Sequence, residues 1–466
     1  MISIIQGDVI EILKDYPDES FVAVFTDPPY GLSKQPDMRE VLSHWLVGDD
    51  YEASGGGFMG KSWDSFVPGP RYWQEIYRVL KPGAVLLAFC GTRTEDLLGI
   101  SIRLAGFERF DTCAWVHAQG FPKSASVDKN IDKEAGVERR RIRDNPNARD
   151  SHGKNPISMQ SSPDSKMKGI TAPATDEAKI WEGYGTSLKP AIEFVLCFRK
   201  PRTATYAKTA MEHGTAALNI DGCRIPSAES YVINTWDDGA KPFGDGAGHP
   251  FTSRQQSGRW PANLILDEVA AEMLDEQIGE RKSGYMKPGQ RRKSSRGLGG
   301  YHGNFPDEAT AEGTYGDSGG LSRFFYCTKS NKKEREMGLR GYFPCLVCGE
   351  IDTTSHINLK ESRSIPCRRN NHTTIKPLAL CKYLAQLIIP PEEYRDDANL
   401  LIPFAGVMSE AIGALLAGWR NITAIELEKE YCEIGQKRVD WWVAKIQETG
   451  LTNPKAILKT RHKEKT

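Results

Sequence analysis

The sequence predicts an α/β protein whose central sheet is mostly parallel, because apolar runs of strand length alternate with segments of helical periodicity. The runs at residues 21–27, 84–91 and 191–200 are almost continuously apolar. Such runs are typical of strands that are covered by helices on both faces. The alternation occurs near both ends of the chain, so we expect both ends to contribute to one sheet.

The first 125 residues contain the amino-terminal part of this pattern. Strands are expected at "ISIIQGD", "FVAVFTD", "AVLLAFCG" and "RFDTCAWVH". The segments "VIEILKDY" and "PRYWQEIYRVLKPG" separate the first three strands and have helical spacing. A further strand, "AIEFVLCFRK", is expected within residues 181–200 and would complete the sheet.

Residues 371–450 repeat the alternation of helices and strands. The segment "KPLALCKYLAQLII" has apolar residues at helical spacing, at Leu378, Cys381, Leu384 and Ile388. Strands are expected at "ANLLIPFAG" and "NITAIELE", and helices at "SEAIGALLAGW" and "EYCEIGQKRVDWWVAKI". Residues 451–466 form a basic tail that we expect to fray.

The middle of the chain has a different composition. Residues 126–180 are polar and rich in Pro, Ser and Asn, which predicts a flexible insertion. Residues 201–370 have no regular period and are rich in Gly, Arg, Lys and aromatic residues. We interpret them as an inserted recognition region.

Composition excludes several classes of protein. Lys plus Arg equals Asp plus Glu at 61 each, so any polyanion must be bound by local clusters of charge. The longest apolar runs are far shorter than the ~20 residues that cross a bilayer, and the amino terminus lacks the basic lead of a secretory signal. We expect no membrane association and a cytoplasmic location, in a bacterium or a phage-infected host. The 10 scattered cysteines indicate reduced thiols and one metal site.

A strand that ends in "DPPY", residues 27–30, is suited to bind a flat amine. The two prolines fix the backbone, so the Asp27 carboxylate and the Pro28 carbonyl become rigid acceptors. Tyr30 offers a ring face for stacking. A primary amine on a planar heterocycle has two N–H donors for these acceptors. The competing interpretation is a proline turn with an acid on the surface.

Residues 398–426 have the layout of a nucleoside-binding βαβ unit. A strand, a turn at Gly406 and a helix lead to a second strand that ends in Glu426. An acid at that point binds ribose hydroxyls in such units, and the helix amino terminus faces an anionic group. A plain βαβ crossover without a ligand is the alternative.

Together these motifs resemble the amino-group DNA methyltransferases, and their order resembles the circularly permuted β group of that family. "TDPPYG" comes first and "PFAG" last, with a recognition region between them. Further matches are "GDVIEIL", "RVLKPGAVLLAFCGT", "GFPKS", "GTSLKPAIEFVLCFRKP", "RFFYCTKSNKKERE" and "HTTIKPL". Several of them are similar to phage and prophage members. The resemblance implies a Rossmann-like fold that uses S-adenosylmethionine, with a mostly parallel sheet of about seven strands.

The resemblance also implies roles for individual residues. The catalytic corner, which would hold and activate a flipped base, comprises Asp27, Pro28, Pro29 and Tyr30. The expected cofactor-binding residues are Asp8, Thr374, Lys376, Phe404, Ala405, Gly406 and Glu426. Asp8 would lie near the cofactor adenine, and Thr374 and Lys376 would close over its methionine end.

Three positions depart from the family pattern. Ile402 stands where the family has Asp, Met408 where it has a second Gly, and Thr373 where it has Pro. Glycine tolerates backbone angles and close contacts that methionine does not, so Met408 is expected to narrow the approach to the cofactor.

Three local features are predicted to bind DNA or zinc. The stretch 281–296 is basic and contains no acid, which suits DNA phosphates, and "ERRRIR" at 138–143 has a similar character. "CLVCG" has the spacing of a zinc knuckle, with ligands expected at Cys345, Cys348, His356 and Cys367. Cys327 is an alternative ligand.

The leading hypothesis is a site-specific methyltransferase that flips adenine from duplex DNA and methylates its N6 amine. Asp at position 27 favours adenine, and cytosine N4 is the alternative target. A second hypothesis is a DNA- or zinc-binding homologue with impaired cofactor binding, and a third is a methyltransferase of glutamine side chains or RNA. A homodimer and a restriction–modification role are both compatible with the sequence, which identifies no endonuclease partner.

Overall fold

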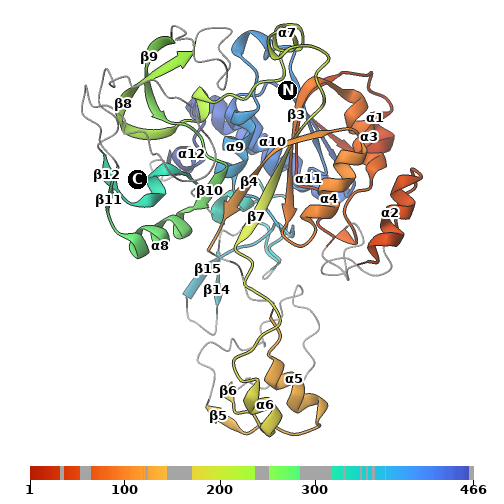
Figure 1. The fold of residues 1–466 in the computed structure, drawn as a ribbon, viewed down its shortest axis with the longest axis vertical. Coiled ribbons are helices and arrows are strands. Elements are labelled where there is room, and N and C mark those ends of the chain that lie inside the picture. The colour runs from red at the N-terminus through yellow and green to blue at the C-terminus, as the bar shows by residue number, and fades with distance from the viewer. Residues whose placement is uncertain are drawn as a thin grey trace, which may run out of the picture.

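A nine-stranded sheet organises the computed structural model (Figure 1). The structure describes residues 1–31, 36–52, 64–118, 120, 124–143, 170–236, 251–283, 317–328, 332–346, 349–352, 355–358, 363–372 and 374–460. The strand order is β1-β17-β16-β2-β3-β7-β4-β10-β13. Only β7 runs antiparallel to its neighbours, so the predicted mostly parallel α/β sheet is confirmed.

The strands come from all parts of the chain. In spatial order they are β1 (Ile2–Gln6), β17 (Asn421–Glu426), β16 (Asn399–Pro403), β2 (Phe21–Thr26), β3 (Leu80–Gly91), β7 (Ile192–Arg199), β4 (Glu108–Val116), β10 (Leu264–Asp267) and β13 (Tyr326–Thr328). The expected number was seven. The two additional strands, β10 and β13, come from the predicted recognition region and extend the sheet beyond β4.

Strands from the two ends of the chain pair at the centre of the sheet. Leu400 and Leu401 of β16 lie opposite Ala23 and Val24 of β2, in parallel register. Where both strands end, the Thr26 hydroxyl donates a hydrogen bond of 2.6 Å to the Pro403 carbonyl. The expectation that both ends of the chain build one sheet is therefore confirmed.

Helices cover both faces of this sheet. One layer contains α1 (Val9–Leu13), α3 (Pro70–Val79) and α4 (Glu95–Leu104), and the other contains α9 (Leu378–Leu387), α10 (Ser409–Ala417) and α11 (Lys429–Thr449). Alternate residues of each central strand point to opposite layers. Val24 of β2 and Leu86 of β3 pack in the first layer, whereas Phe25 and Leu87 pack in the second. Burial on both faces explains why these strands are continuously apolar.

The remaining elements lie around this core. They are α2 (Met38–Leu46), α5 (Val127–Glu134), β5 (Arg141–Arg143), β6 (Ile170–Thr171), α6 (Asp176–Ile180), α7 (Tyr206–His213), β8 (Ile225–Trp236), β9 (Phe251–Arg259), α8 (Glu268–Ile278), β11 (Arg281–Lys282), β12 (Ser318–Gly319), β14 (Ser355–Asn358), β15 (Arg363–Pro366) and α12 (Pro454–Thr460). Short 3-10 helices are η3 (Asp221–Cys223), η4 (Leu321–Phe324), η5 (Lys332–Glu336) and η6 (Glu392–Tyr394).

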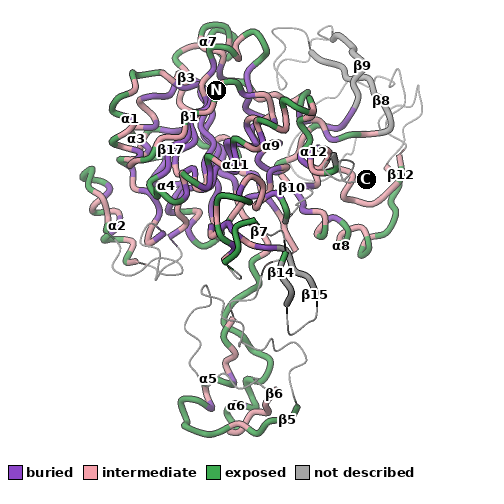
Figure 2. Tube along the Cα trace, turned by 180° about the vertical axis from the view of Figure 1, so that it is seen from behind, coloured by how far each residue is buried: buried purple, intermediate pink, exposed green. Residues whose placement is uncertain are grey.

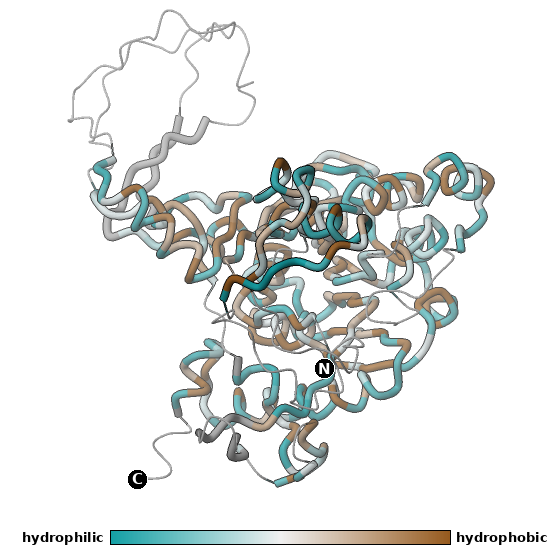
Figure 3. Tube along the Cα trace, turned by 90° about the horizontal axis from the view of Figure 1, so that it is seen from below, coloured by the Kyte–Doolittle hydropathy of each residue, from teal (hydrophilic) through white to brown (hydrophobic). Residues whose placement is uncertain are grey.

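The predicted insertion forms an arm that projects from the body and is mostly exposed (Figures 1 and 2). Its described part is held by Asp132, whose carboxylate accepts hydrogen bonds from the Arg139 guanidinium and the Thr175 amide. Residues 144–169 lie outside the described chain, and the flexibility of the insertion stays a prediction. Hydrophobic and hydrophilic residues are interspersed along the elements (Figure 3), and no described helix is both long and apolar enough to span a bilayer.

Met408, the departure from the family glycine, occupies a left-handed turn immediately before α10. Its φ of 67° is one that glycine adopts freely and that costs another residue about 1–2 kcal/mol. The side chain is fully buried and faces α11, where a Cβ added at Gly435 would lie 2.4 Å from Met408 Cγ. Glycine at position 435 therefore makes the room that methionine at position 408 needs.

We expect Gly435→Ala to destabilise the protein by about 1–3 kcal/mol, because the new methyl group overpacks a filled site. Gly99→Ala is the matched control within α4, since a Cβ there meets nothing nearer than 3.6 Å. The control is expected to be neutral or to gain up to about 1 kcal/mol, because alanine favours a helix over glycine. Urea unfolding measures both changes.

In a Met408→Ala background, Gly435→Ala should destabilise less than it does in the wild type, because the group with which the new methyl clashes is absent. Equal stability of the two glycine variants would contradict the packing of Met408 against Gly435.

Candidate active site

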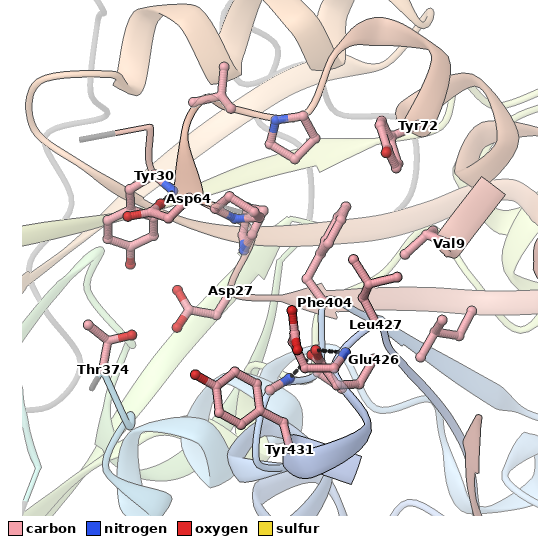
Figure 4. Close-up of a pocket in the computed structure, with 18 of the residues that line it drawn as sticks. Val9, Asp27, Tyr30, Asp64, Tyr72, Thr374, Phe404, Glu426, Leu427 and Tyr431 are labelled. Carbon is pink, nitrogen blue, oxygen red and sulfur yellow. Dashed lines mark hydrogen bonds between the residues drawn. The ribbon is translucent and has the colours of Figure 1, made fainter. Parts of the chain in front are cut away.

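The carboxyl ends of the parallel strands surround a pocket of about 410 Å³ (Figure 4). In a parallel α/β sheet this edge is where ligands bind. Asp27 and Tyr30 lie at one end of the pocket, and Phe404, Glu426 and Tyr72 lie at the other. The sheet brings together all the residues predicted for catalysis and cofactor binding: Asp8, Asp27, Pro28, Pro29, Tyr30, Thr374, Lys376, Phe404, Ala405, Gly406 and Glu426.

The corner after β2 is held rigidly from three directions. The Asp64 carboxylate accepts hydrogen bonds from the Tyr30 amide at 2.8 Å and the Gly31 amide at 3.2 Å. The Thr94 hydroxyl donates to the Tyr30 carbonyl at 2.6 Å. Gly31 has a φ of 62°, which permits the tight turn. With the two prolines, these contacts fix the backbone that carries Asp27 and Tyr30.

Asp27 presents one engaged and one unengaged carboxylate oxygen. Oδ2 lies 2.6 Å from the Lys376 ammonium. Oδ1 is buried and accepts no hydrogen bond of normal geometry from any described residue. Burial raises the pKa of Asp27, and the charge of Lys376 opposes that shift. A buried oxygen without a donor is costly, so Oδ1 is ready to accept a hydrogen bond from a ligand.

Lys376 lies at the catalytic end of the pocket and connects Asp27 to Glu193. Its ammonium is 3.3 Å from a Glu193 oxygen, and its side chain is only 4% exposed. The same Glu193 oxygen accepts a hydrogen bond of 3.0 Å from the Tyr30 hydroxyl. Burial lowers the pKa of Lys376, but Asp27 and Glu193 together raise it above the ordinary value. Asp27, Lys376, Glu193 and Tyr30 thus form one connected network.

The turn after β16 is anchored by Glu426 at the end of β17. The Gly406 amide donates to one Glu426 oxygen at 2.7 Å, and the Glu428 amide donates to the other at 2.8 Å. Burial raises the pKa of Glu426 against these hydrogen bonds. A Cβ at Gly406 would lie 2.9 Å from the His372 ring, so only glycine leaves the turn room beside that histidine.

Aromatic rings and Asp8 line the far end of the pocket. Asp8 caps α1 by accepting from the Ile10 amide at 2.9 Å, and its other oxygen accepts from the Tyr72 hydroxyl at 3.3 Å. Burial and then the charge of Asp8 raise the pKa of Tyr72 to about 12, so this hydroxyl remains a donor. The Tyr72 and Phe404 ring centroids are 5.9 Å apart. A flat heterocycle with polar edges fits between such groups.

Thr373, one of the three departures from the family pattern, lies outside the described residues, and the other two do not narrow the pocket. Ile402 and Met408 are fully buried and neither lines it. The expectation that Met408 narrows the approach is therefore wrong, because its side chain turns toward α11. Glu410 does line the pocket, and burial together with the nearby charge of Asp27 raises its pKa to about 7.

Sequence reasoning missed four residues that position the site: Asp64, Tyr72, Thr94 and Glu193. Glu193 had a signal, since it is the only charged residue within the apolar run "AIEFVLCF". A charge in a strand that is buried on both faces needs a partner. Asp64, Tyr72 and Thr94 had no such signal, because their roles arise from contacts between distant segments.

The predicted zinc ligands are only partly described. Cys345 and Cys367 are both buried, and the Arg368 amide lies 3.4 Å from the Cys345 sulfur. Cys348 and the side chain of His356 lie outside the described residues. Among those that are described, no three His, Cys, Asp or Glu residues gather as a metal site. The zinc knuckle stays a prediction, as does phosphate binding by residues 281–296, of which residues 284–296 are not described.

Comparisons with known proteins identify similar sequences and structures. No curated protein matches the chain. Solved structures that match the chain include an M1.HpyAVI complex with S-adenosylmethionine, which is 14% identical, covers 94% of this chain and 100% of its own, and has a TM-score of 0.33. The cytosine-N4-specific PvuII DNA methyltransferase is 11% identical, covers 94% of this chain and 86% of its own, and has a TM-score of 0.38.

Residues 21–437 match the family model of the N6/N4 DNA methylases. The match includes both the Asp27 corner and the Glu426 turn, and it spans most of the chain. The protein is therefore a DNA methyltransferase that belongs to the N6/N4 DNA methylase family.

Proposed function

We propose that the protein methylates the N6 amine of adenine at specific sites in double-stranded DNA, with S-adenosylmethionine as the methyl donor. The observation that carries this proposal is the unengaged Oδ1 of Asp27, which is buried in the same pocket as the Glu426 turn. An acceptor that lacks a donor fits a substrate amine, and family membership supplies the chemistry.

The far end of the pocket fits S-adenosylmethionine. Its volume of about 410 Å³ falls within the range of ligand sites, roughly 300–1,000 Å³. Phe404 and Tyr72 would flank the adenine, and Glu426 would accept hydrogen bonds from ribose hydroxyls. Each Glu426 oxygen accepts one backbone amide and retains a second lone pair for this purpose. When bound, the cofactor supplies an electrophilic methyl group on a sulfonium sulfur.

Asp27 and Pro28 would activate the substrate amine by orientation. The lone pair of an exocyclic amine is delocalised into the heterocycle, so the amine is a poor nucleophile. Hydrogen bonds from its two N–H groups to Asp27 Oδ1 and the Pro28 carbonyl would turn the nitrogen toward tetrahedral geometry and localise that pair. This is a proximity and orientation effect that requires no proton transfer before the methyl group moves.

Tyr30 would hold the flipped base. An amine inside a duplex cannot reach Asp27, so the base must leave the stack at a cost of a few kcal/mol. Stacking on an aromatic ring recovers about 1–3 kcal/mol per base. Asp64 and Thr94 hold the Tyr30 backbone, and the hydrogen bond from its hydroxyl to Glu193 holds the ring. We assign selection of the DNA sequence to residues 201–370. They contribute β10 and β13, which form the edge of the sheet beyond β4.

The N4 amine of cytosine is the competing substrate, because it presents the same two N–H donors to Asp27 and Pro28. Asp at position 27 favours adenine by resemblance to the family. A DNA-binding homologue without cofactor is disfavoured, since Met408 and Ile402 leave the pocket open.

The identity of the methylated base tests the proposal directly. DNA from cells that express the protein should carry N6-methyladenine within one recurrent sequence, measured by sequencing with modified-base detection. N4-methylcytosine in such a sequence would transfer the proposal to the alternative substrate. DNA without either modification, in cells with folded protein, would refute it.

Asp27→Asn should reduce methyl transfer by at least about 100-fold, since preorganised hydrogen-bonding groups commonly contribute this much. The amide keeps the shape of the carboxylate but removes its charge. Cofactor affinity, measured by calorimetry, should be unchanged. Asp15→Asn, at an exposed aspartate, is the matched control. Retained activity in Asp27→Asn would remove Asp27 from the mechanism.

Glu426→Gln should weaken cofactor binding by about 10- to 100-fold, because hydrogen bonds to a charged group contribute about 1.5–3 kcal/mol. The dissociation constant is measured by calorimetry, without DNA. Glu433→Gln on α11 is the control, since Glu433 is 55% exposed. If both variants bind the cofactor as the wild type does, Glu426 has no role in ribose binding.

A further inference from the structure

Lys376 is a buried cation at the centre of the catalytic corner. Its ammonium lies 2.6 Å from Asp27 Oδ2 and 3.3 Å from Glu193. The Tyr30 and Phe89 rings flank it, with centroids 5.2 and 4.9 Å away. Taking an ammonium out of water is costly, and two carboxylates with two aromatic faces compensate that cost here.

We propose that Lys376 is a positioning residue for Asp27: it keeps the buried carboxylate ionised and engages Oδ2, so that Oδ1 is left for the substrate amine. This inference rests on the proposed role of Asp27 as the acceptor of that amine. It differs from the expectation that Lys376 closes over the methionine end of the cofactor.

The first reason is that the surroundings of Asp27 favour the neutral form of its carboxyl group. Burial raises the pKa of Asp27, and the nearby charge of Glu193 raises it further. A protonated carboxyl group has lost part of its acceptor capacity and carries no charge to polarise the amine. The Lys376 ammonium lowers the pKa of Asp27 through its charge and its hydrogen bond, and so opposes neutralisation.

The second reason is that the surroundings hold no equivalent cation among the described residues. Several titratable groups on neighbouring elements surround the Asp27–Lys376 pair: Tyr30, Cys90, His117, Glu193, Cys381, Glu410 and Arg438. His117 lies 3.9 Å from the other Glu193 oxygen, and the Arg438 guanidinium donates to the Val407 carbonyl. Without Lys376, the ion pair of Asp27 is lost and the acids Glu193 and Glu410 remain beside it.

The third reason is geometric. A carboxylate rotates about its terminal torsion unless an oxygen is held. The contact between Lys376 and Oδ2 fixes the plane of the group and determines which oxygen is unengaged. Lys376 therefore acts on the amine only through Asp27.

The pH dependence of methyl transfer at saturating cofactor tests the proposal. Lys376→Met removes the charge but keeps an unbranched chain, and Lys376→Arg keeps the charge. In the Met variant, the acid limb of the pH–rate profile should move to higher pH by about 1–3 units, because Asp27 loses an adjacent opposite charge. Within that limb its rate should be at least ~10-fold below wild type and should recover as pH rises. The Arg variant should keep the wild-type limb, and both should bind cofactor normally.

A second measurement does not depend on activity. Difference infrared spectroscopy of the free protein detects the C=O stretch of a protonated carboxyl group. As pH falls, this band should appear in Lys376→Met at a higher pH than in wild type, and Asp27→Asn should abolish it. This band reports the effect of Lys376 on Asp27 even if the wild-type protein methylates no adenine. Failure of the proposed function can therefore be distinguished from failure of this inference.

The proposal would be overturned if Lys376→Met kept the wild-type acid limb of the pH–rate profile and bound the cofactor more weakly. Lys376 would then be a cofactor ligand. If Lys376→Met shows no melting transition, Lys376→Gln carries the same infrared test, since it also removes the charge of Lys376. An Asp27 band that appears at the wild-type pH in that folded variant would refute the inference.

Discussion

The parallel pairing of β16 with β2 is the interaction on which the site depends. The two strands lie more than 370 residues apart in the chain, and the Thr26 hydroxyl joins their ends at the Pro403 carbonyl. Each strand leads directly into a constrained turn, one at Asp27 and the other at Phe404. Because parallel neighbours end at the same edge of a sheet, the two turns must face one pocket. Each turn supplies only part of the site, so the site requires both.

Buried charge is the second constraint on this pocket. Asp27, Glu193, Lys376, Glu410 and Arg438 all lie in or beside a region from which water is largely excluded. In such a region an isolated charge costs several kcal/mol, so the groups are arranged in pairs and networks. Within this arrangement, Asp27 Oδ1 accepts no hydrogen bond from the described residues. That imbalance is the property expected of a site that awaits a donor from its substrate.

The turn at Met408 illustrates how a departure from a family pattern is accommodated. A glycine is favoured there because the backbone is left-handed, and the chain keeps that backbone with a methionine. The side chain is directed away from the pocket and into space beside Gly435. Gly435 thus leaves the space that the Met408 side chain occupies, and Met408 does not line the pocket.

The sequence by itself determined the α/β class, the strands that end at Asp27 and Glu426, and eleven of the residues that line the pocket. These features are local: apolar periodicity, proline-fixed turns and a glycine at a tight turn leave a signature within a few residues. Only the tertiary structure decided the two extra strands, the contact of Lys376 with Asp27, the roles of Asp64 and Tyr72, and the direction of Met408. Each of these depends on side chains from distant segments that meet in three dimensions, and on the cost of burying their charge and volume together, which no local pattern encodes.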